Sequence, residues 1–440
     1  MTFTKFGKAL LMSALSAAVV LSVTSCIQSY SVGYLYVTGT VTSQSGGNGI
    51  ITGFEIDHNT GQLNALHGLP VSSGGANPVR AVLIVGSRFL YVLNRGTNAA
   101  GGSVCTSTNP CSGSNITQFA VGGNGVLSAQ QTFYTQGINP FRLVADSTGR
   151  YLYALDHDSP DNTQCHLALG AGVNACGDVT AYSIDQTTGR LQLIVNAQVT
   201  AANGASLTYF PVPANPIDFV ENGGYLLTLV GTPAAGDSVF PYTSASNGQL
   251  TISLNSSDSI GSVHNATAIV AGGSYLYVLD NEAPTPNPTS AASQILAFTV
   301  GSGGALQAQN SGIVADDPTL SNPNYLVVES KGKYLYLANQ AGNSANANSP
   351  NGGIAGYVID QSQHTLSFTD PSTFGTGSGP QCIVEDPSDQ FIYTANFTDS
   401  TVTGRVVDPN SGVLNGLRVN GGTFALSGQP TWCLVDGRTN

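Results

Sequence analysis

The chain has 440 residues and a formal net charge of −12, and charged residues make up only 9% of it. This negative balance disfavours nucleic acid as a partner, because the phosphate backbone selects clusters of lysine and arginine. Apolar residues reach 41%, which argues against a disordered chain and for a packed core.

The first 26 residues have the features of an export signal. Two lysines precede the apolar run 9–23, and small residues then lead to Cys26. This order is typical of a secretory signal rather than of a membrane-spanning helix. Because a cysteine directly after Val-Thr-Ser resembles a bacterial lipobox, we expect residues 1–25 to be removed and Cys26 to be lipidated. A plain secretory signal with an incidental cysteine is the alternative.

We expect residues 26–33 to tether the protein to a membrane of the bacterial cell envelope, in the periplasm or at the outer-membrane surface. Several acyl chains on one cysteine would anchor the chain stably, whereas a single chain anchors only marginally.

The rest of the chain is a series of repeats. Four segments of equal length place a proline turn before two apolar runs, and two looser copies follow the same order: 77–94, 139–156, 322–339, 379–396, 215–230 and 264–280. Two apolar runs rich in Tyr, Val and Leu around a short turn predict a β-hairpin. A second hairpin follows, as in 179–194, so each unit supplies four strands. Past the N-terminus no long stretch keeps a 3.6-residue period, and little helix is expected.

The two ends of the chain hold the halves of a seventh unit. Residues 34–39 match a second strand without a first, and residues 429–440 match a first strand without a second. A repeat split between the termini is how a circular fold closes. The sequence therefore predicts an all-β, seven-bladed β-propeller over residues 34–440, closed by N- and C-terminal strands of one blade. Such a ring distributes its core between blades, which a chain of this length requires.

Six cysteines remain besides Cys26, an even number that suits disulfides in an oxidising compartment. Cys105 and Cys111 would close one short loop, and Cys165 and Cys176 another. Cys382 and Cys433 lie on first strands of neighbouring blades, two and three residues after their prolines, so strand alternation would point them toward each other. Metal ligation is the alternative, although the chain has no C-x-x-C pair and its histidines are scattered.

The YLYV-x-N ending of the repeats, their Asn-Pro or Gly-Pro opening and the ID-x-x-TG-x-L hairpin resemble the bacterial lactonase family of seven-bladed propellers. This is the 6-phosphogluconolactonase type, within the wider YVTN-repeat propellers. The resemblance covers essentially the whole mature chain. It implies that residues just after the first-strand proline face a pocket at one end of the central channel. Matched by position, these are Arg80, Arg142, Asp218, Tyr325, Cys382 and Trp432, with Ala266 or Thr267 in the irregular blade.

Two features depart from the family pattern. The Gly-Pro-Arg-His stretch of the family is replaced by Gly-Pro-Gln-Cys at 379–382, and the Asp-Leu-Gly segment has no counterpart.

Arg80 and Arg142 are the first candidates for chemistry. Arginine binds carboxylate or phosphate through paired donors, so two guanidinium groups on adjacent blades could hold an anion or polarise a lactone carbonyl. Asp218 on the next blade would then activate water. The alternative is that each arginine pairs with a neighbouring acid or with loop carbonyls.

Other candidates also have two interpretations. Tyr325 and Trp432 are candidate ligand contacts, and Trp432 could instead wedge the closing strand. His264 could act as a general base near neutral pH or serve only as a hydrogen-bonding group at a strand entrance.

The loop 156–162 contains three aspartates, Asp156, Asp158 and Asp161, that could bind calcium or simply be solvated. We expect no metal centre and no cofactor, because the motifs of serine hydrolases, zincins and P-loop proteins do not occur.

From these observations we expect a monomeric, exported lipoprotein that hydrolyses a sugar lactone or binds a small anionic sugar derivative at the mouth of the channel. The competing class is a non-catalytic envelope binding or scaffold propeller. It would act through long loops between second and third strands, on one face of the disc: 97–114, 156–177, 282–293 and 340–352.

Overall fold

A computed structural model describes most of the chain from residue 30 onward. The described residues are 30–41, 48–84, 86, 88–97, 105–106, 108–201, 203–232, 236–253, 257–261, 263–284, 291–343, 352–363, 365–418 and 420–437. Cys26 and the expected signal segment 1–25 lie outside them, as do parts of the loops 97–114, 282–293 and 340–352.

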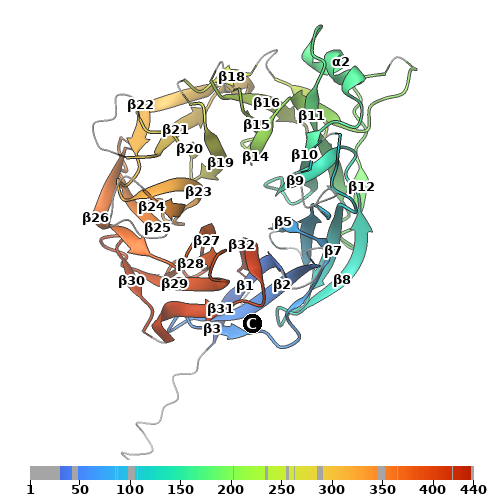
Figure 1. The fold of residues 1–440 in the computed structure, drawn as a ribbon. Helices are drawn as coiled ribbons and strands as arrows, with labels where there is room; N and C mark the ends of the chain where they lie inside the picture. The colour runs from blue at the N-terminus through green and yellow to red at the C-terminus, as the bar shows by residue number, and fades with distance from the viewer. Residues whose placement is uncertain are drawn as a thin grey trace, which may run out of the picture.

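The described residues form seven antiparallel sheets arranged around a central axis (Figure 1). In blade 1 the strands from axis to rim are β5 (Pro78–Leu83), β6 (Phe89–Asn94), β7 (Asn115–Val121) and β8 (Leu127–Phe133). Blade 2 has β9 (Ile138–Ala145), β10 (Tyr151–Asp158), β11 (Cys176–Ile184) and β12 (Leu191–Leu193), with β13 (Phe210–Pro213) also on β11. Blade 3 has β14 (Pro216–Asn222), β15 (Tyr225–Val230), β16 (Ser238–Ser244) and β17 (Leu250–Ile252), with β18 (Asp258–Ser259) on β16.

The remaining blades repeat this layout. Blade 4 has β19 (Ala266–Gly272), β20 (Tyr275–Asp280), β21 (Gln294–Val300) and β22 (Leu306–Ala315). Blade 5 has β23 (Leu320–Val328), β24 (Tyr334–Gly342), β25 (Gly353–Ile359) and β26 (Leu366–Gly375). Blade 6 has β27 (Pro380–Glu385), β28 (Phe391–Asn396), β29 (Thr401–Val407) and β30 (Leu414–Gly416), with β31 (Thr423–Ala425) on β29. Blade 7 has β32 (Gln429–Asp436), β1 (Ser31–Thr40), β2 (Asn48–Asp57) and β3 (Leu63–Ala65), with β4 (Val71–Ala76) on β2.

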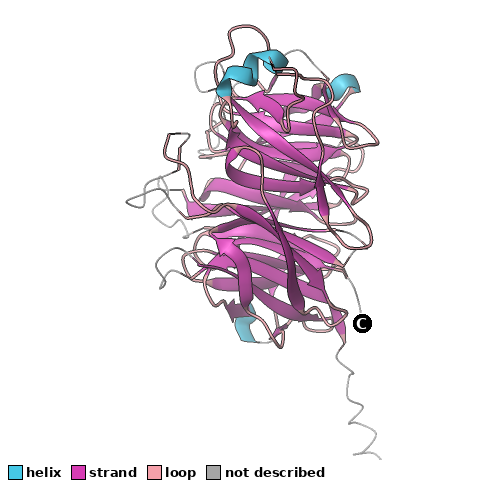
Figure 2. Cartoon of the chain, turned by 90° about the vertical axis from the view of Figure 1, so that its right-hand side faces the viewer, coloured by secondary structure: helices cyan, strands magenta, loops and turns pink. Residues whose placement is uncertain are grey.

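Helix is confined to short segments toward the rim of the disc (Figure 2). In the described part of the chain these are η2 (Asn162–Gln164), α2 (Cys165–Leu169), η3 (Ser302–Gly304) and η4 (Asn420–Gly422). None of the helices in the described ranges has the length and apolar character needed to cross a membrane.

The ring closes within blade 7. Strand β32 pairs antiparallel with β1, and Val37 lies opposite Cys433 while Tyr34 lies opposite Asp436. The C-terminal strand therefore provides the innermost strand of a blade whose other strands come from the N-terminus (Figure 1). The predicted fold and its mode of closure are confirmed.

The proline openings of the repeats have a local backbone reason. The residue before the proline adopts a positive φ in five blades, which asparagine and glycine tolerate best: Asn77, Asn139, Asn215, Asn322 and Gly379. Its carbonyl accepts the amide that follows the second strand, as in Arg95 N to Asn77 O at 3.0 Å and Phe397 N to Gly379 O at 2.8 Å. The opening thus fixes where the inner strand begins.

A β-bulge follows immediately. Pro78 lies opposite Asn94, whereas Arg80, two residues on, lies opposite Leu93, only one residue on. The same shift occurs in every blade, between the proline position and the residue two places later. Bulges re-aim side chains, so this one sets the direction of the residues nearest the axis.

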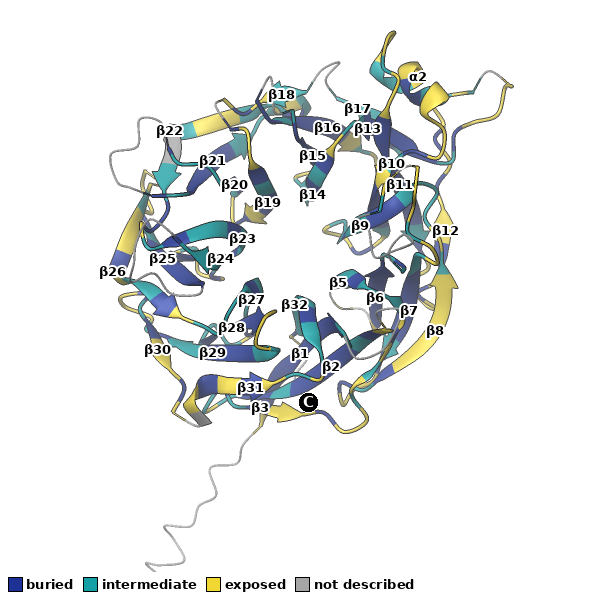
Figure 3. Cartoon of the chain, viewed as in Figure 1, coloured by how far each residue is buried: buried dark blue, intermediate teal, exposed yellow. Residues whose placement is uncertain are grey.

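The apolar core lies between the blades, and the inner and middle strands of the ring are largely buried whereas outer strands such as β8 are exposed (Figure 3). Within the described residues, seven clusters of buried side chains each draw on two adjacent blades. Each blade is therefore covered on both faces, which agrees with the continuous apolar runs of its inner strands.

Among the residues that the structure describes, a tyrosine of the second strand ties four of the blades to the next through a glycine carbonyl. The hydroxyl of Tyr91 donates to the carbonyl of Gly189 at 2.5 Å, and that of Tyr336 donates to Gly412 at 2.8 Å. Across the closure, Tyr393 of blade 6 donates to Gly61 of blade 7 at 2.8 Å. These acceptors lie in outer hairpin turns, where the glycine has a positive φ. The repeat therefore encodes contacts between blades as well as strands.

Three disulfides are present, in the pairs that the cysteine positions favour. Cys105 bonds to Cys111, Cys165 to Cys176, and Cys382 to Cys433. The last bond joins β27 of blade 6 to β32 of blade 7, with the two Cα atoms 5.9 Å apart. It holds the closing strand covalently to the neighbouring blade.

We predict that Tyr393→Phe lowers the free energy of unfolding by about 1–2 kcal/mol, because the buried carbonyl of Gly61 loses its donor. Urea unfolding of the purified protein measures the change. Tyr134→Phe is the control, since Tyr134 is 65% exposed. Equal midpoints for Tyr393→Phe and the wild type would contradict a stabilising role for this tether.

Candidate functional site

The candidate site is built from one repeated position, the residue two places after the proline of each inner strand. In blades 1 to 7 this position holds Arg80, Arg142, Asp218, Ala268, Tyr325, Cys382 and Trp432. Five of these side chains gather at the axis, and we call Arg80, Arg142, Asp218, Tyr325 and Trp432 the axial layer.

The irregular fourth blade needs a correction. The sequence match placed Ala266 or Thr267 at this position, with His264 in place of the proline. In the structure the carbonyl of Asn265 accepts the amide of Asn281, as Asn77 does for Arg95, so Ala266 occupies the proline position. The register shift between Ala266 and Ala268 then puts Ala268 in the layer position. The predicted position is therefore one or two residues out of register in this blade, because the proline that marks the register is missing.

Asp218 joins the two arginines. Arg142 Nε donates to Asp218 Oδ1 at 2.9 Å, and Arg80 Nη2 lies 3.6 Å from the same oxygen. Asp218 Oδ2 accepts the backbone amide of Ile269 at 3.2 Å. The Asp218 side chain is only 4% exposed, whereas that of Arg142 is 26% exposed. Two cations therefore share one anion, and the layer carries an excess positive charge.

The aromatic side of the layer supports Arg80. Its guanidinium carbon lies 3.6 Å from the ring centroid of Trp432 and 5.7 Å from that of Tyr325. The two rings meet edge to face with centroids 4.7 Å apart. Cation–π contacts of this kind strengthen when water is excluded. Trp432 also packs against the apolar clusters on both sides of blade 7. It therefore both contacts Arg80 and holds the closing strand in place.

Burial also affects protonation in the layer. It is the main cause that lowers the pKa of Arg80 to about 10, and the charge of Arg142 lowers it further, while Asp218 partly opposes both. Arg80 remains a cation at neutral pH. Burial raises the pKa of Tyr325, so its phenol stays neutral and can donate a hydrogen bond.

Two cavities adjoin the axial layer, one on each side. The larger, about 340 Å³, extends along the inner strands toward the turns that join first and second strands, as far as Ile84 and Gly149. The smaller, about 230 Å³, lies toward the strand openings and is lined by Asn324, Gln381 and Thr431 among others. Both cavities contact all five residues of the layer. A ligand in either one would meet the arginines.

The structure does not bring His264 into this site. Its side chain is 43% exposed, and its Nδ1 lies 3.3 Å from Glu282 Oε2. It lines neither cavity. His264 lies before the inner strand β19 and four residues before the layer position Ala268, so its side chain does not reach the axis. His264 is therefore not placed to transfer a proton at the axial layer.

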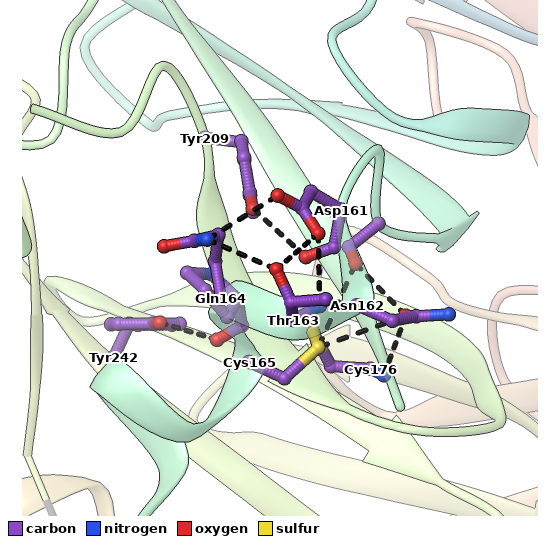
Figure 4. Close-up of a disulfide and its surroundings, with 10 residues drawn as sticks. Asp161, Asn162, Thr163, Gln164, Cys165, Cys176, Tyr209 and Tyr242 are labelled. Atoms are coloured by element: carbon purple, nitrogen blue, oxygen red, sulfur yellow. Dashed lines mark hydrogen bonds between the residues drawn. A yellow bond between two sulfur atoms is a disulfide. The ribbon is translucent and has the colours of Figure 1, made fainter. Parts of the chain in front are cut away.

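The three aspartates of loop 156–162 do not gather around one point. Asp161 caps η2, where its Oδ1 accepts the amide of Thr163 at 2.9 Å (Figure 4). Beside it, the Cys165–Cys176 disulfide holds α2 to the start of β11 (Figure 4). Asp158 contacts His157 and Asn139, and Asp156 points into blade 2. Across the described ranges, no three acidic, histidine or cysteine side chains form a metal-ligand group.

Asp156 instead faces a partner that the sequence did not indicate. Asp178 lies directly opposite it across β10 and β11, and both residues are fully buried. Thr135 Oγ1 donates to Asp156 Oδ1 at 2.7 Å. Burial is the main cause that raises the pKa of Asp156 to about 7 and that of Asp178 well above its usual range. Two facing carboxyl groups without a cation are stable only when at least one is protonated.

A sequence model described as "Lactonase, 7-bladed beta-propeller" matches residues 34–208 and 286–416. The chain belongs to this lactonase family. A search of curated protein sequences found no match.

Solved structures agree on the fold of this lactonase-family propeller. It resembles the periplasmic gluconolactonase of Pseudomonas aeruginosa at 17% identity and a TM-score of 0.63, covering 91% of this chain and 98% of that one. A candidate 6-phosphogluconolactonase of Bacteroides fragilis gives 16% identity and a TM-score of 0.62, with coverage of 92% and 98%. A second, from Bacteroides uniformis, gives 16% and 0.61, with coverage of 92% and 99%.

We predict that this lactonase-family propeller loses stability as pH rises from about 5 to 8. The folded state holds its proton on the Asp156–Asp178 pair to higher pH than the unfolded chain does, so this contribution is present at low pH and is lost as pH rises through the raised pKa. Asp178→Asn keeps the size of the side chain but removes its ionisable carboxyl group, so Asp156 no longer faces a second carboxylate. This variant should flatten the dependence and make the protein more stable at pH 8.

Urea unfolding at pH 5, 6, 7 and 8 measures the effect, with exposed Asp370→Asn as the control. Parallel pH profiles for Asp178→Asn and the wild type would refute the shared proton.

Proposed function

We propose that the protein hydrolyses a lactone at the axial layer, releasing the corresponding hydroxy acid. The main support is the pair Arg80 and Arg142 beside Asp218, between two cavities that open to opposite sides of the layer. Family membership and the gluconolactonase and 6-phosphogluconolactonase names of the similar structures point the same way. Sugar lactones are therefore the first substrates to test.

The proposed reaction depends on electrostatic stabilisation of the transition state and needs no covalent enzyme intermediate. A water oxygen bonds to the lactone carbonyl carbon, the ring C–O bond breaks, and a proton from the water passes to the departing ring oxygen. Negative charge builds up first on the carbonyl oxygen, and two adjacent guanidinium groups stabilise it. The carboxylic acid formed loses its remaining proton to solvent, and the same arginines bind the resulting carboxylate through paired donors.

Asp218 is the acidic group in this layer that is placed to take up the proton. Each of its oxygens already accepts one hydrogen bond from the protein, from Arg142 Nε and from the amide of Ile269. Oδ1 faces both arginines, whereas Oδ2 accepts only the Ile269 amide and keeps a position for a water from the adjoining cavities. Asp218 would hold Arg142 in place and orient the attacking water at the same time.

Binding without hydrolysis is the second candidate. The observation that favours it is that Asp218 is already paired with both arginines, which stabilises its charge and weakens it as a base. The long loops join second and third strands, so they emerge on the face where the inner strands open and where the smaller cavity lies. A propeller of this kind would capture an anionic sugar derivative or an envelope component.

We predict that Asp218→Asn lowers kcat for lactone opening at least about 100-fold with little change in KM, because it keeps the shape but removes the base. Arg142→Ala should also raise KM. A pH-indicator assay over a panel of sugar and simple lactones measures turnover, and Asp258→Asn, away from the axis, is the control.

If no lactone is opened while hydroxy acids bind, the binding function replaces hydrolysis. Unchanged turnover in Asp218→Asn would remove Asp218 from the reaction.

We also propose that the chain is exported and anchored by lipid on Cys26 at the bacterial envelope. The signal-like order of residues 1–26 supports this, and one similar structure is a periplasmic enzyme. A fatty-acid label supplied to a bacterial host should appear in the protein and fractionate with membranes. Cys26→Ser should lose both the label and the membrane association. A labelled Cys26→Ser protein would contradict the anchor.

A further inference from the structure

A ring of aliphatic side chains lies next to the axial layer. The residue four places after the proline position is valine in six blades and leucine in the seventh: Val82, Val144, Val220, Val270, Val327, Val384 and Leu434. We call this ring the valine collar. It is two residues beyond the layer on the same strand faces, which corresponds to about 7 Å along the axis.

The larger cavity runs along one side of this collar. Val82, Val144, Val220 and Val270 line it, together with Leu83 and Ala145. Val82, Val144 and Val220 are partly exposed even though they belong to inner strands. Their apolar surface therefore faces the cavity as well as the core between blades.

Two polar side chains outside the axial layer line this cavity, Asp146 and the exposed Ser147, and both lie at its far end. Asp146 lines the far end of the cavity, but its Oδ1 accepts the amides of Arg150 and Tyr151 at 2.8 and 2.7 Å. Its Oδ2 accepts the amide of Thr148 at 3.1 Å. The backbone amides of the turn thus occupy the Asp146 carboxylate. The other charged groups that line the cavity belong to the axial layer. The cavity is cationic at one end and aliphatic along its wall.

We propose that the larger cavity holds an aliphatic chain, and that the substrate is a lactone carrying an alkyl or acyl chain of several carbons. The lactone head would lie against Arg80 and Arg142, and the chain would extend along the valine collar. The proposal rests on the proposed function in taking a lactone as the reacting group. The cavity of about 340 Å³ lies at the lower end of the volumes, roughly 300–1,000 Å³, that small-molecule sites have.

The wall chemistry separates this class from polyhydroxylated sugars. Hydroxyl groups placed against valine lose their water hydrogen bonds without gaining partners. Each methylene moved from water to an apolar wall instead improves affinity about fourfold. An aliphatic chain is thus favoured against the valine side chains, where the hydroxyl groups of a sugar are penalised.

Tryptophan fluorescence tests the proposal directly, because Trp432 is the only tryptophan and lies under Arg80. The mature protein is titrated with straight-chain carboxylates from butanoate to decanoate, and with gluconate and 6-phosphogluconate. We expect the Kd to fall roughly three- to fourfold per added methylene until the cavity is filled. The two sugar acids should bind more weakly than octanoate.

Two variants test where the aliphatic chain of the ligand lies. Val144→Thr and Val220→Thr keep side-chain shape but replace one methyl group of the cavity wall by a hydroxyl, so each should raise the Kd of octanoate about tenfold and leave butanoate within about twofold. Val384→Thr is the matched control, because Val384 holds the same collar position in blade 6 but does not line the larger cavity. An equal loss in Val384→Thr would overturn the placement of the chain.

Lactone turnover separates this proposal from the proposed function. Faster opening of γ-decanolactone than of γ-butyrolactone and gluconolactone, with the same valine dependence, supports both. Turnover of gluconolactone with no dependence on chain length overturns the aliphatic class and keeps lactone hydrolysis. Chain-dependent carboxylate binding with no lactone opened supports the chain site and overturns hydrolysis.

Discussion

The pairing of β32 with β1 is the constraint on which the rest of this structure depends. It turns a linear series of repeats into a ring, and only a ring brings the inner strands of seven blades around one axis. Trp432 lies on the closing strand itself, beside Arg80 from blade 1, so the site is incomplete until the ring is closed. The Cys382–Cys433 disulfide and the Tyr393–Gly61 hydrogen bond reinforce the same junction.

Charge is the second organising feature. The axial layer places two guanidinium groups and one carboxylate at positions that are largely removed from water. Burying an excess cation is unfavourable unless a partner compensates its charge. Here the partners within the protein are one aspartate and two aromatic rings. A site that retains an unbalanced buried charge sacrifices stability, which is typical of functional rather than structural positions.

Each inner strand has positions that recur between blades and one position that differs between them. The proline opening, the bulge, the collar and the tyrosine tether recur because every blade must pack on its neighbours in the same way. The position two after the proline varies between blades, and in five of them its side chain reaches the axis. Blade 4 uses a small residue there, Ala268, and blade 6 uses Cys382 for the disulfide, so five blades supply the site.

The sequence by itself determined the fold, its closure and the cysteine pairs, because these follow from short-range patterns that repeat along the chain. The resemblance to the lactonase family, matched by repeat position, also grouped Arg80, Arg142, Asp218, Tyr325 and Trp432, together with Cys382 and Ala266 or Thr267. It misplaced blade 4, where the missing proline removed the marker for the register.

Only the tertiary structure decided how far each side chain reaches and what it meets there. It joined Asp218 to both arginines, excluded His264 from the layer and placed Asp178 against Asp156. It also divided the space around the layer into two unequal cavities. Strand periodicity reports which way a residue points within its own blade. Burial, ion pairing and cavity shape depend on contacts between blades, and these are distant in the chain.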